Sequence, residues 1–197
     1  MDDMKIGVLA LQGAFREHIA ILRRLGVSAV EVRLPEDLCD MEGLILPGGE
    51  STTIGKLAAA YGLIDSLRRF AHDRPVWGTC AGMILMARKI DLDPPCLGFM
   101  NIVVQRNAFG RQMDSFVEEL RICVWKDSGR HPFPGVFIRA PKLIEVGEGV
   151  QVIARLNDGT AVAVREGNWL ATAFHPELTD DMRFHKYFID IVNKMHK

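Results

Sequence analysis

The chain has 197 residues, of which 48% are hydrophobic and 25% charged, and its formal net charge is −1. This composition is typical of a globular protein, and the length suits one well-packed domain better than two. The charge lacks the basic excess of a nucleic-acid-binding protein, and no apolar run approaches the roughly 20 residues that span a bilayer. The acidic start is unlike a secretory signal. We therefore expect one domain over residues 1–197, located in the cytoplasm.

The first half of the chain alternates short apolar strands with helices. Ser51 is the expected N-cap of the second helix. Such alternation predicts an α/β fold of three layers, in which a mostly parallel sheet carries helices on both faces. From hydrophobic periodicity and breakers, strands are expected at 5–11, 29–32, 43–46 and 76–77, and helices at 14–25, 51–60, 63–71 and 81–88.

The second half is richer in strands and predicts a small antiparallel extension of the sheet. Asn157-Asp158-Gly159 separates two strand-like runs and indicates a hairpin. The last segment predicts a helix over 180–194, with Phe184, Phe188, Ile191 and Val192 toward the core. Strands are expected at 102–104, 116–124, 136–138, 151–156, 160–164 and 169–174.

One of the four cysteines lies in a pattern that indicates a nucleophile. Gly78-Thr79-Cys80-Ala81-Gly82 connects a short strand to a helix and matches a nucleophile elbow with Cys in place of Ser. The glycines would relieve crowding at a sharp turn, the helix start favours a thiolate, and the Ala81 N–H is placed to donate to an oxyanion. The cysteines show no CxxC spacing, so we expect neither a zinc site nor disulfides. We expect Cys39, Cys96 and Cys123 to be buried structural residues.

A cysteine nucleophile needs a base, and Phe174-His175-Pro176-Glu177 offers one after an apolar strand. In extended chain, residues two apart share a face, so Glu177 can fix the tautomer of His175. Taken alone, the segment would be a surface turn; together with the cysteine elbow it favours a triad at the carboxyl ends of the strands. The remaining histidines, which have no neighbouring orienter in the sequence, are expected to be solvated or structural: His18, His72, His131, His185 and His196.

A glycine loop, Leu46-Pro47-Gly48-Gly49-Glu50-Ser51, follows another apolar strand and enters a helix. It is no phosphate-binding P-loop, because five residues separate Gly49 from Gly55 and Lys56 is followed by leucine. The Gly49 N–H is a candidate second oxyanion donor. A plain tight turn is the competing interpretation.

These motifs resemble the class I, triad-type glutamine amidotransferases, and within them the glutaminase subunits of pyridoxal 5′-phosphate synthases. The subunit-specific segments are LALQGAFREH, VVQRNAFGRQMDSF and GVFIRAP, whereas GTCAG, LPGGES and FHPE are shared across the wider family. The resemblance runs almost end to end, with a longer loop at 125–132 and a few extra residues before the first strand. It implies a flavodoxin-like fold with a small antiparallel extension.

The resemblance also implies a site and a partner. Cys80, His175 and Glu177 would form the triad, and Gln12 would lie near the oxyanion loop and the partner interface. No metal or organic cofactor is expected. The partner would be a (β/α)8 synthase subunit in a large hetero-oligomer that uses the ammonia and raises a weak glutaminase activity on docking. Glutamine would be held by Gly49, Glu50, Ser51, Arg106, Ile138 and Arg139.

Three alternatives stay open at this point. The chain could serve a different synthase, such as a histidine-pathway cyclase, although GAFREH and RNAFGRQ argue against it. It could be a non-catalytic module that kept the fold, although all three triad candidates are present. It could also be a cysteine hydrolase or a chaperone-like protein of similar fold.

Overall fold

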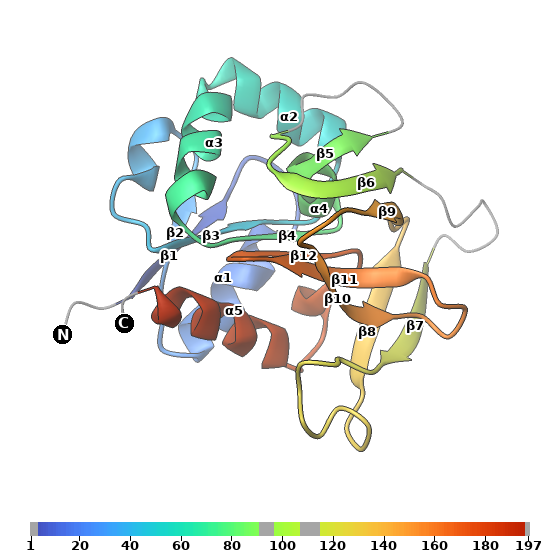
Figure 1. Ribbon diagram of the computed structural model, residues 1–197. Helices are drawn as coiled ribbons and strands as arrows, with labels where there is room; N and C mark the ends of the chain where they lie inside the picture. Colours follow the sequence, from blue (N-terminus) through green and yellow to red (C-terminus); the bar gives the residue numbers. More distant parts are fainter. Residues whose placement is uncertain (1–3, 91–96, 107–114, 196–197) are drawn as a thin grey trace.

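The computed structural model describes residues 4–90, 97–106 and 115–195 (Figure 1). Its centre is a seven-stranded sheet in the order β10-β11-β12-β4-β3-β1-β2. From β12 to β2 neighbouring strands run parallel, while β10 and β11 add an antiparallel edge. The strands are β1 Lys5–Leu9, β2 Ser28–Val32, β3 Gly43–Leu46, β4 Val76–Thr79, β10 Gln151–Arg155, β11 Ala161–Glu166 and β12 Trp169–Thr172.

Helices cover both faces of this sheet, as the alternation of the first half predicts. In Figure 1, α1 (Phe15–Arg24) and α5 (Arg183–Lys194) lie below the sheet. The helices above it are α2 (Ser51–Ala60), α3 (Leu63–Asp73) and α4 (Ala81–Met86). The expected three-layer α/β fold is therefore confirmed. Among the described residues, no helix combines the length and the apolar character that crossing a membrane requires.

Two smaller sheets flank the antiparallel edge. One contains β5 (Ala87–Ile90), β6 (Met100–Gln105) and β9 (Lys142–Val146), and the other pairs β7 (Ser115–Leu120) with β8 (Phe133–Ile138). A bridge between Ile122 and Ala154 ties the chain after β7 to β10. The antiparallel extension predicted from the sequence is present, but most of its strands leave the central sheet.

The core is continuous and contains the predicted faces of the helices. Phe184, Phe188, Ile191 and Val192 of α5 are buried, as expected. The Trp77 ring of β4 lies 6.2 Å from that of Phe184 and 5.7 Å from that of Phe188, centroid to centroid. Aromatic packing of this kind fixes α5 against the strand that ends at the predicted nucleophile.

Local predictions were partly wrong where tertiary pairing decides. The helix expected over 81–88 ends at Met86, because Ala87–Ile90 pairs with β6. Strand β9 was not predicted. Ser51 is the first helical residue of α2 and not its N-cap; Glu50 holds that position without a side-chain cap. The hairpin at 157–159 is confirmed by the antiparallel pairing of β10 and β11.

Two cysteines contradict the expectation of burial. Cys39 and Cys123 are exposed, whereas Cys80 is buried. Cys39 caps a surface 3-10 helix, Pro35–Leu38, and Cys123 follows β7, where its sulfur lies 3.5 Å from the Val152 carbonyl oxygen. Both positions lie at the ends of elements, which water reaches more easily than their centres. Cys96 lies outside the described residues.

Candidate active site

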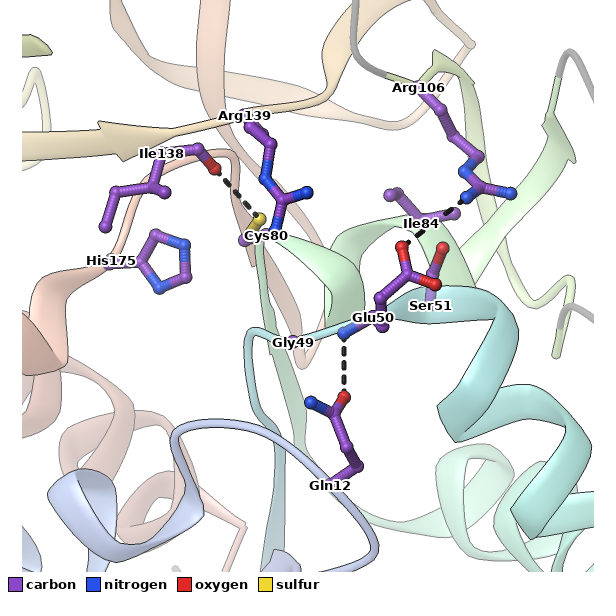
Figure 2. A pocket seen from close by; sticks show the side chains of 10 residues that line it. All are labelled: Gln12, Gly49, Glu50, Ser51, Cys80, Ile84, Arg106, Ile138, Arg139 and His175. Atoms are coloured by element: carbon purple, nitrogen blue, oxygen red, sulfur yellow. Dashed lines mark hydrogen bonds and ion pairs between the residues drawn. The ribbon is translucent and has the colours of Figure 1, made fainter. Parts of the chain in front are cut away.

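A pocket of about 210 Å³ opens at the carboxyl ends of the parallel strands. It collects nearly all the residues predicted from the sequence. Ala81 begins α4 directly after Cys80, and Glu177 is buried behind His175. The lining residues, shown in Figure 2, are Gln12, Gly49, Glu50, Ser51, Cys80, Ile84, Arg106, Ile138, Arg139 and His175.

Cys80 occupies the expected sharp turn between β4 and α4. Its φ of 47° and ψ of −100° lie in a region that side chains rarely adopt. The Cys80 N–H donates to the Thr172 carbonyl at 2.8 Å, which ties the turn to the neighbouring strand β12. The sulfur lies 4.0 Å from the Ile138 carbonyl oxygen and points into the pocket (Figure 2).

Both glycines of the elbow are required by close packing. A Cβ added to Gly82 would lie 2.0 Å from the Leu46 carbonyl oxygen, and one on Gly78 would lie 2.5 Å from the Gly82 carbonyl carbon. These neighbours are backbone atoms, which cannot move aside cheaply. The pattern therefore places α4 directly against the ends of β3 and β4.

His175 and Glu177 form the pair expected from their spacing. The Nδ1 atom of His175 lies 2.7 Å from Oε1 of Glu177, whose side chain is fully buried. The backbone N–H of His175 donates to the Val136 carbonyl oxygen at 2.8 Å. This hydrogen bond anchors the backbone of His175 to β8. In Figure 2 the ring faces the same space as the Cys80 sulfur.

The surroundings of His175 favour its charged form. Burial alone would disfavour the imidazolium, but interactions with Cys80 and with the Glu177 carboxylate outweigh burial and raise the pKa of His175 to about 10. The ring is therefore poised as a proton donor at neutral pH.

The glycine loop lies opposite the nucleophile and is held from two sides. The backbone N–H of Glu50 donates a hydrogen bond to Oε1 of Gln12 at 2.7 Å. The backbone N–H of Ala14 donates to the Gly48 carbonyl oxygen at 2.9 Å. Gln12 thus lies beside the glycine loop.

Arginines enter the pocket from the small sheets. Arg106 follows β6 and donates from Nη1 to Thr52 Oγ1 at 3.0 Å, and its Nη2 lies 3.8 Å from Glu50 Oε1. Arg139 follows β8 and has a φ of 43°, a strained value for a non-glycine residue. Figure 2 shows the Arg139 guanidinium beside Cys80 and the Arg106 guanidinium directed toward Glu50. The motif residues 107–114 lie outside the described residues.

Sequence reasoning missed a polar cluster behind the triad. His18 and His185 are fully buried, and Nδ1 of His18 lies 3.0 Å from Nε2 of His185. No orienter adjoins either residue in the sequence, and the partners of both come from distant parts of the chain. The helical spacing of His18 from Leu22, four residues on and also buried, could have placed it on the inner face of α1. Of the remaining histidines, His72 and His131 are exposed, and His196 lies outside the described residues.

Comparison with known proteins agrees with the fold and the motifs. Residues 8–194 match the SNO glutamine amidotransferase family. A relative from Herpetosiphon aurantiacus, named pyridoxal 5′-phosphate synthase subunit PdxT, is 54% identical over 95% of this chain and 100% of its own length. One of the same name from Dehalococcoides mccartyi is 55% identical over 95% of this chain and 97% of its own.

Solved structures extend the comparison to the fold. A crystal structure of a glutamine amidotransferase has a TM-score of 0.88 and 50% identity, and the match covers 95% of this chain and 98% of that one. The PurLQS structure from Thermotoga maritima has a TM-score of 0.70 at 18% identity over the whole of both chains, which shows a common fold alone. On these matches, the chain belongs to the SNO glutamine amidotransferase family.

Proposed function

We propose that this chain hydrolyses L-glutamine to L-glutamate and ammonia, and that it does so as the glutaminase subunit of a pyridoxal 5′-phosphate synthase. The observation that carries the proposal is one pocket in which a strained cysteine faces a histidine held by a buried carboxylate. The membership of the family and the names of relatives at 54% and 55% identity support the same activity. The whole chain would act as one domain.

In the proposed mechanism Cys80 acts as thiolate and His175 as imidazolium. The thiolate attacks the side-chain amide carbon of glutamine, and the oxyanion is held by the N–H groups of Gly49 and Ala81. His175 then protonates the departing ammonia, which leaves a thioester on Cys80. The neutral ring takes a proton from water, the hydroxide attacks the thioester, and glutamate leaves. Glu177 keeps the Nδ1 proton on the ring, so that Nε2 serves the reaction.

The walls of the pocket suit the two charged groups on the α-carbon of glutamine. A guanidinium binds a carboxylate through two parallel hydrogen bonds, so Arg106 and Arg139 would hold the α-carboxylate. The Glu50 carboxylate is the matching group for the α-ammonium. Ser51 and Ile138 also line the pocket and complete the set of residues proposed to hold glutamine. A substrate that lacks either charge should therefore bind less well.

The proposed partner is a (β/α)8 synthase subunit that consumes the ammonia in a large hetero-oligomer. Ammonia released into water at neutral pH takes up a proton and loses its nucleophilicity. Direct delivery to the synthase subunit would keep it unprotonated and reactive. We propose that docking acts through Gln12 and the glycine loop, because Gln12 already holds the Glu50 N–H. Glutamate release measured with and without the synthase subunit tests this. Equal rates would contradict activation by docking.

The nucleophile is tested by labelling and by substitution. A glutamine-mimicking electrophile should alkylate Cys80, as read by mass spectrometry, while the exposed Cys39 and Cys123 serve as internal references. Cys80→Ala should abolish glutamate release, and Cys123→Ala should leave it unchanged. Glutamate release that survives in Cys80→Ala would refute the proposed chemistry.

A further inference from the structure

The carboxylate of Glu177 has two oxygens, and the triad uses one of them. Oε1 accepts from His175, whereas Oε2 lies beside the buried side chain of His18. Among the described residues, Oε2 accepts no hydrogen bond of ordinary geometry, and its one ion-pair contact is Nε2 of His18 at 3.4 Å. Both side chains are fully buried, so water does not compensate the charge there. His18 is thus the group placed to satisfy the inner oxygen.

His18 is held in a chain of buried polar groups that connects α1 to α5. Its Nδ1 lies 3.0 Å from Nε2 of His185, and its Nε2 lies 3.3 Å from the hydroxyl oxygen of Thr79. The two helices lie on the same face of the sheet (Figure 1). Trp77 packs edge-on against both imidazoles, at 5.5 Å and 5.0 Å between ring centroids. This packing leaves the rings little freedom to turn away.

The orphaned atoms decide which nitrogens carry hydrogen. If Nε2 of His18 donates to Glu177, its Nδ1 must accept from Nε2–H of His185, and Nδ1 of His185 carries no hydrogen. Of the four ring nitrogens of His18 and His185, only Nδ1 of His185 has no hydrogen-bond partner among the described residues. The opposite arrangement would bury an N–H without an acceptor and turn a lone pair of His18 toward the carboxylate. The first arrangement is the coherent one.

Both inner histidines are neutral at physiological pH, as this arrangement requires. Burial, with the charges of His185 and His175, lowers the pKa of His18 well below its usual value. Burial lowers the pKa of His185 to about 3. A neutral donor can satisfy a carboxylate without cancelling its charge, which His175 needs.

We propose that His18 is a positioning residue of the active site: its Nε2–H is shared between Thr79 Oγ1 at 3.3 Å and Glu177 Oε2 at 3.4 Å, and so fixes the carboxylate that orients His175. The chain of groups then runs from His185 through His18 and Glu177 to His175 and Cys80. This role rests on the proposed glutaminase function. His18 would act on the reaction through Glu177 and His175, although it touches neither the substrate nor the nucleophile.

The tautomers test the proposal in the unmodified protein. Nitrogen NMR of ¹⁵N-histidine-labelled chain, with resonances assigned by single histidine replacements, should show His18 and His185 both protonated at Nε2. A His18 ring protonated at Nδ1 would overturn the proposal. This readout does not depend on catalytic activity.

Two substitutions at one position separate positioning from packing. His18→Leu removes the donor, and His18→Gln keeps an N–H near the place of Nε2. His18→Leu should lower kcat about 10- to 100-fold with little change in KM, as loss of a supporting hydrogen bond does elsewhere. His18→Gln should stay within about threefold of the parent. Ile19→Val, a buried change on the same helix, is the packing control and should leave kcat unchanged.

The pH profile gives a readout that packing alone does not move. The titratable groups that face Glu177 are His175 and His18, with Cys80 and His185 one step further. His18→Leu removes a donor from beside the charged carboxylate, so the acid limb of kcat against pH should move to a higher pH than in the parent. The rate of Cys80 alkylation by iodoacetamide against pH should shift in the same direction.

The outcomes keep the two proposals apart. If His18→Leu melts at a lower temperature but keeps the parent kcat and acid limb, the residue is merely structural and the positioning role is wrong. Equal impairment of His18→Gln and His18→Leu would contradict it too. If the parent releases no glutamate even with its synthase partner, the proposed function fails. In that case the alkylation profile and the tautomers still decide the role of His18.

Discussion

The central parallel sheet and the small flanking sheets contribute different groups to one pocket. Cys80 and His175 follow β4 and β12, which are adjacent strands of the core. Arg106 and Arg139 follow β6 and β8, which belong to the two small sheets. The groups proposed to react therefore follow strands of the buried central sheet, and the groups proposed to hold the substrate follow peripheral strands. If this division is functional, changes in the core should act on kcat or stability, and changes at the periphery should act on KM.

The largest effect is expected from Glu177→Gln. The amide can present an N–H to Nδ1 of His175 and impose the wrong tautomer, so kcat should fall about 10³- to 10⁴-fold with KM nearly unchanged. Steady-state glutamate release measures both constants. Glu36→Gln, at an exposed position, is the matched control. A rise in KM without a fall in kcat would contradict the expectation that changes in the core act on kcat.

The next effect concerns the close approach of α4 to β3. Gly82→Ala would put a Cβ 2.0 Å from the Leu46 carbonyl oxygen, so the elbow must shift. We expect a loss of ~3 kcal/mol in the free energy of unfolding, read by urea denaturation. Gly129→Ala adds its Cβ in open space and should stay within about 0.5 kcal/mol of the parent. Equal stability of the two variants would show that the core tolerates the change.

A smaller effect is expected at the periphery. Arg139→Gln removes a charge proposed to hold the α-carboxylate, so KM for glutamine should rise about 10- to 100-fold while kcat changes little. Arg130→Gln, on the exposed surface, should change neither constant. A fall in kcat at constant KM would place Arg139 with the reacting groups instead.

The smallest effect is a pH dependence of stability in the core. Burial lowers the pKa of His185 from its usual 6.5 to about 3. The contribution of neutral His185 to the free energy of unfolding is therefore full above about pH 6.5 and is lost as the pH falls toward 3. In that range the histidine is protonated in the unfolded chain but not in the folded one. Between pH 7 and 5 this group alone should cost up to about 2 kcal/mol. His185→Gln, which cannot titrate, should flatten that part of the curve in thermal unfolding; an unchanged slope would contradict it.

The sequence predicted the core better than the flanks for a physical reason. Gly43–Leu46 and the elbow around Cys80 follow from local chemistry: a fully apolar run bounded by glycine and proline, and a turn that only glycines permit. Strand β5 depends on a distant partner. The sequence pattern extends the helix into Ala87–Ile90, but in the structure this segment pairs with β6. Local pattern carries no information about such a partner.

The site divides in the same way. The spacing of His175 and Glu177 indicated their pairing, because both lie in one short segment. The contact of His18 with Glu177 joins residues 159 positions apart, and only the packing of α1 against the strand ends brings them together. Arg106 and Arg139 were placed through the resemblance, because isolated arginines in loops carry no local signal of a pocket.

The pairing of β12 with β4 has a further consequence. Thr172 lies beside Thr79 in the parallel register, so sulfur and imidazole are spaced by a backbone ladder and a single turn on each side. The two residues therefore belong to one hydrogen-bonded part of the central sheet, which holds their spacing. If Cys80 and His175 react as proposed, a partner or an inhibitor that regulates the chemistry should act on the loops proposed to hold glutamine, while the pair stays assembled.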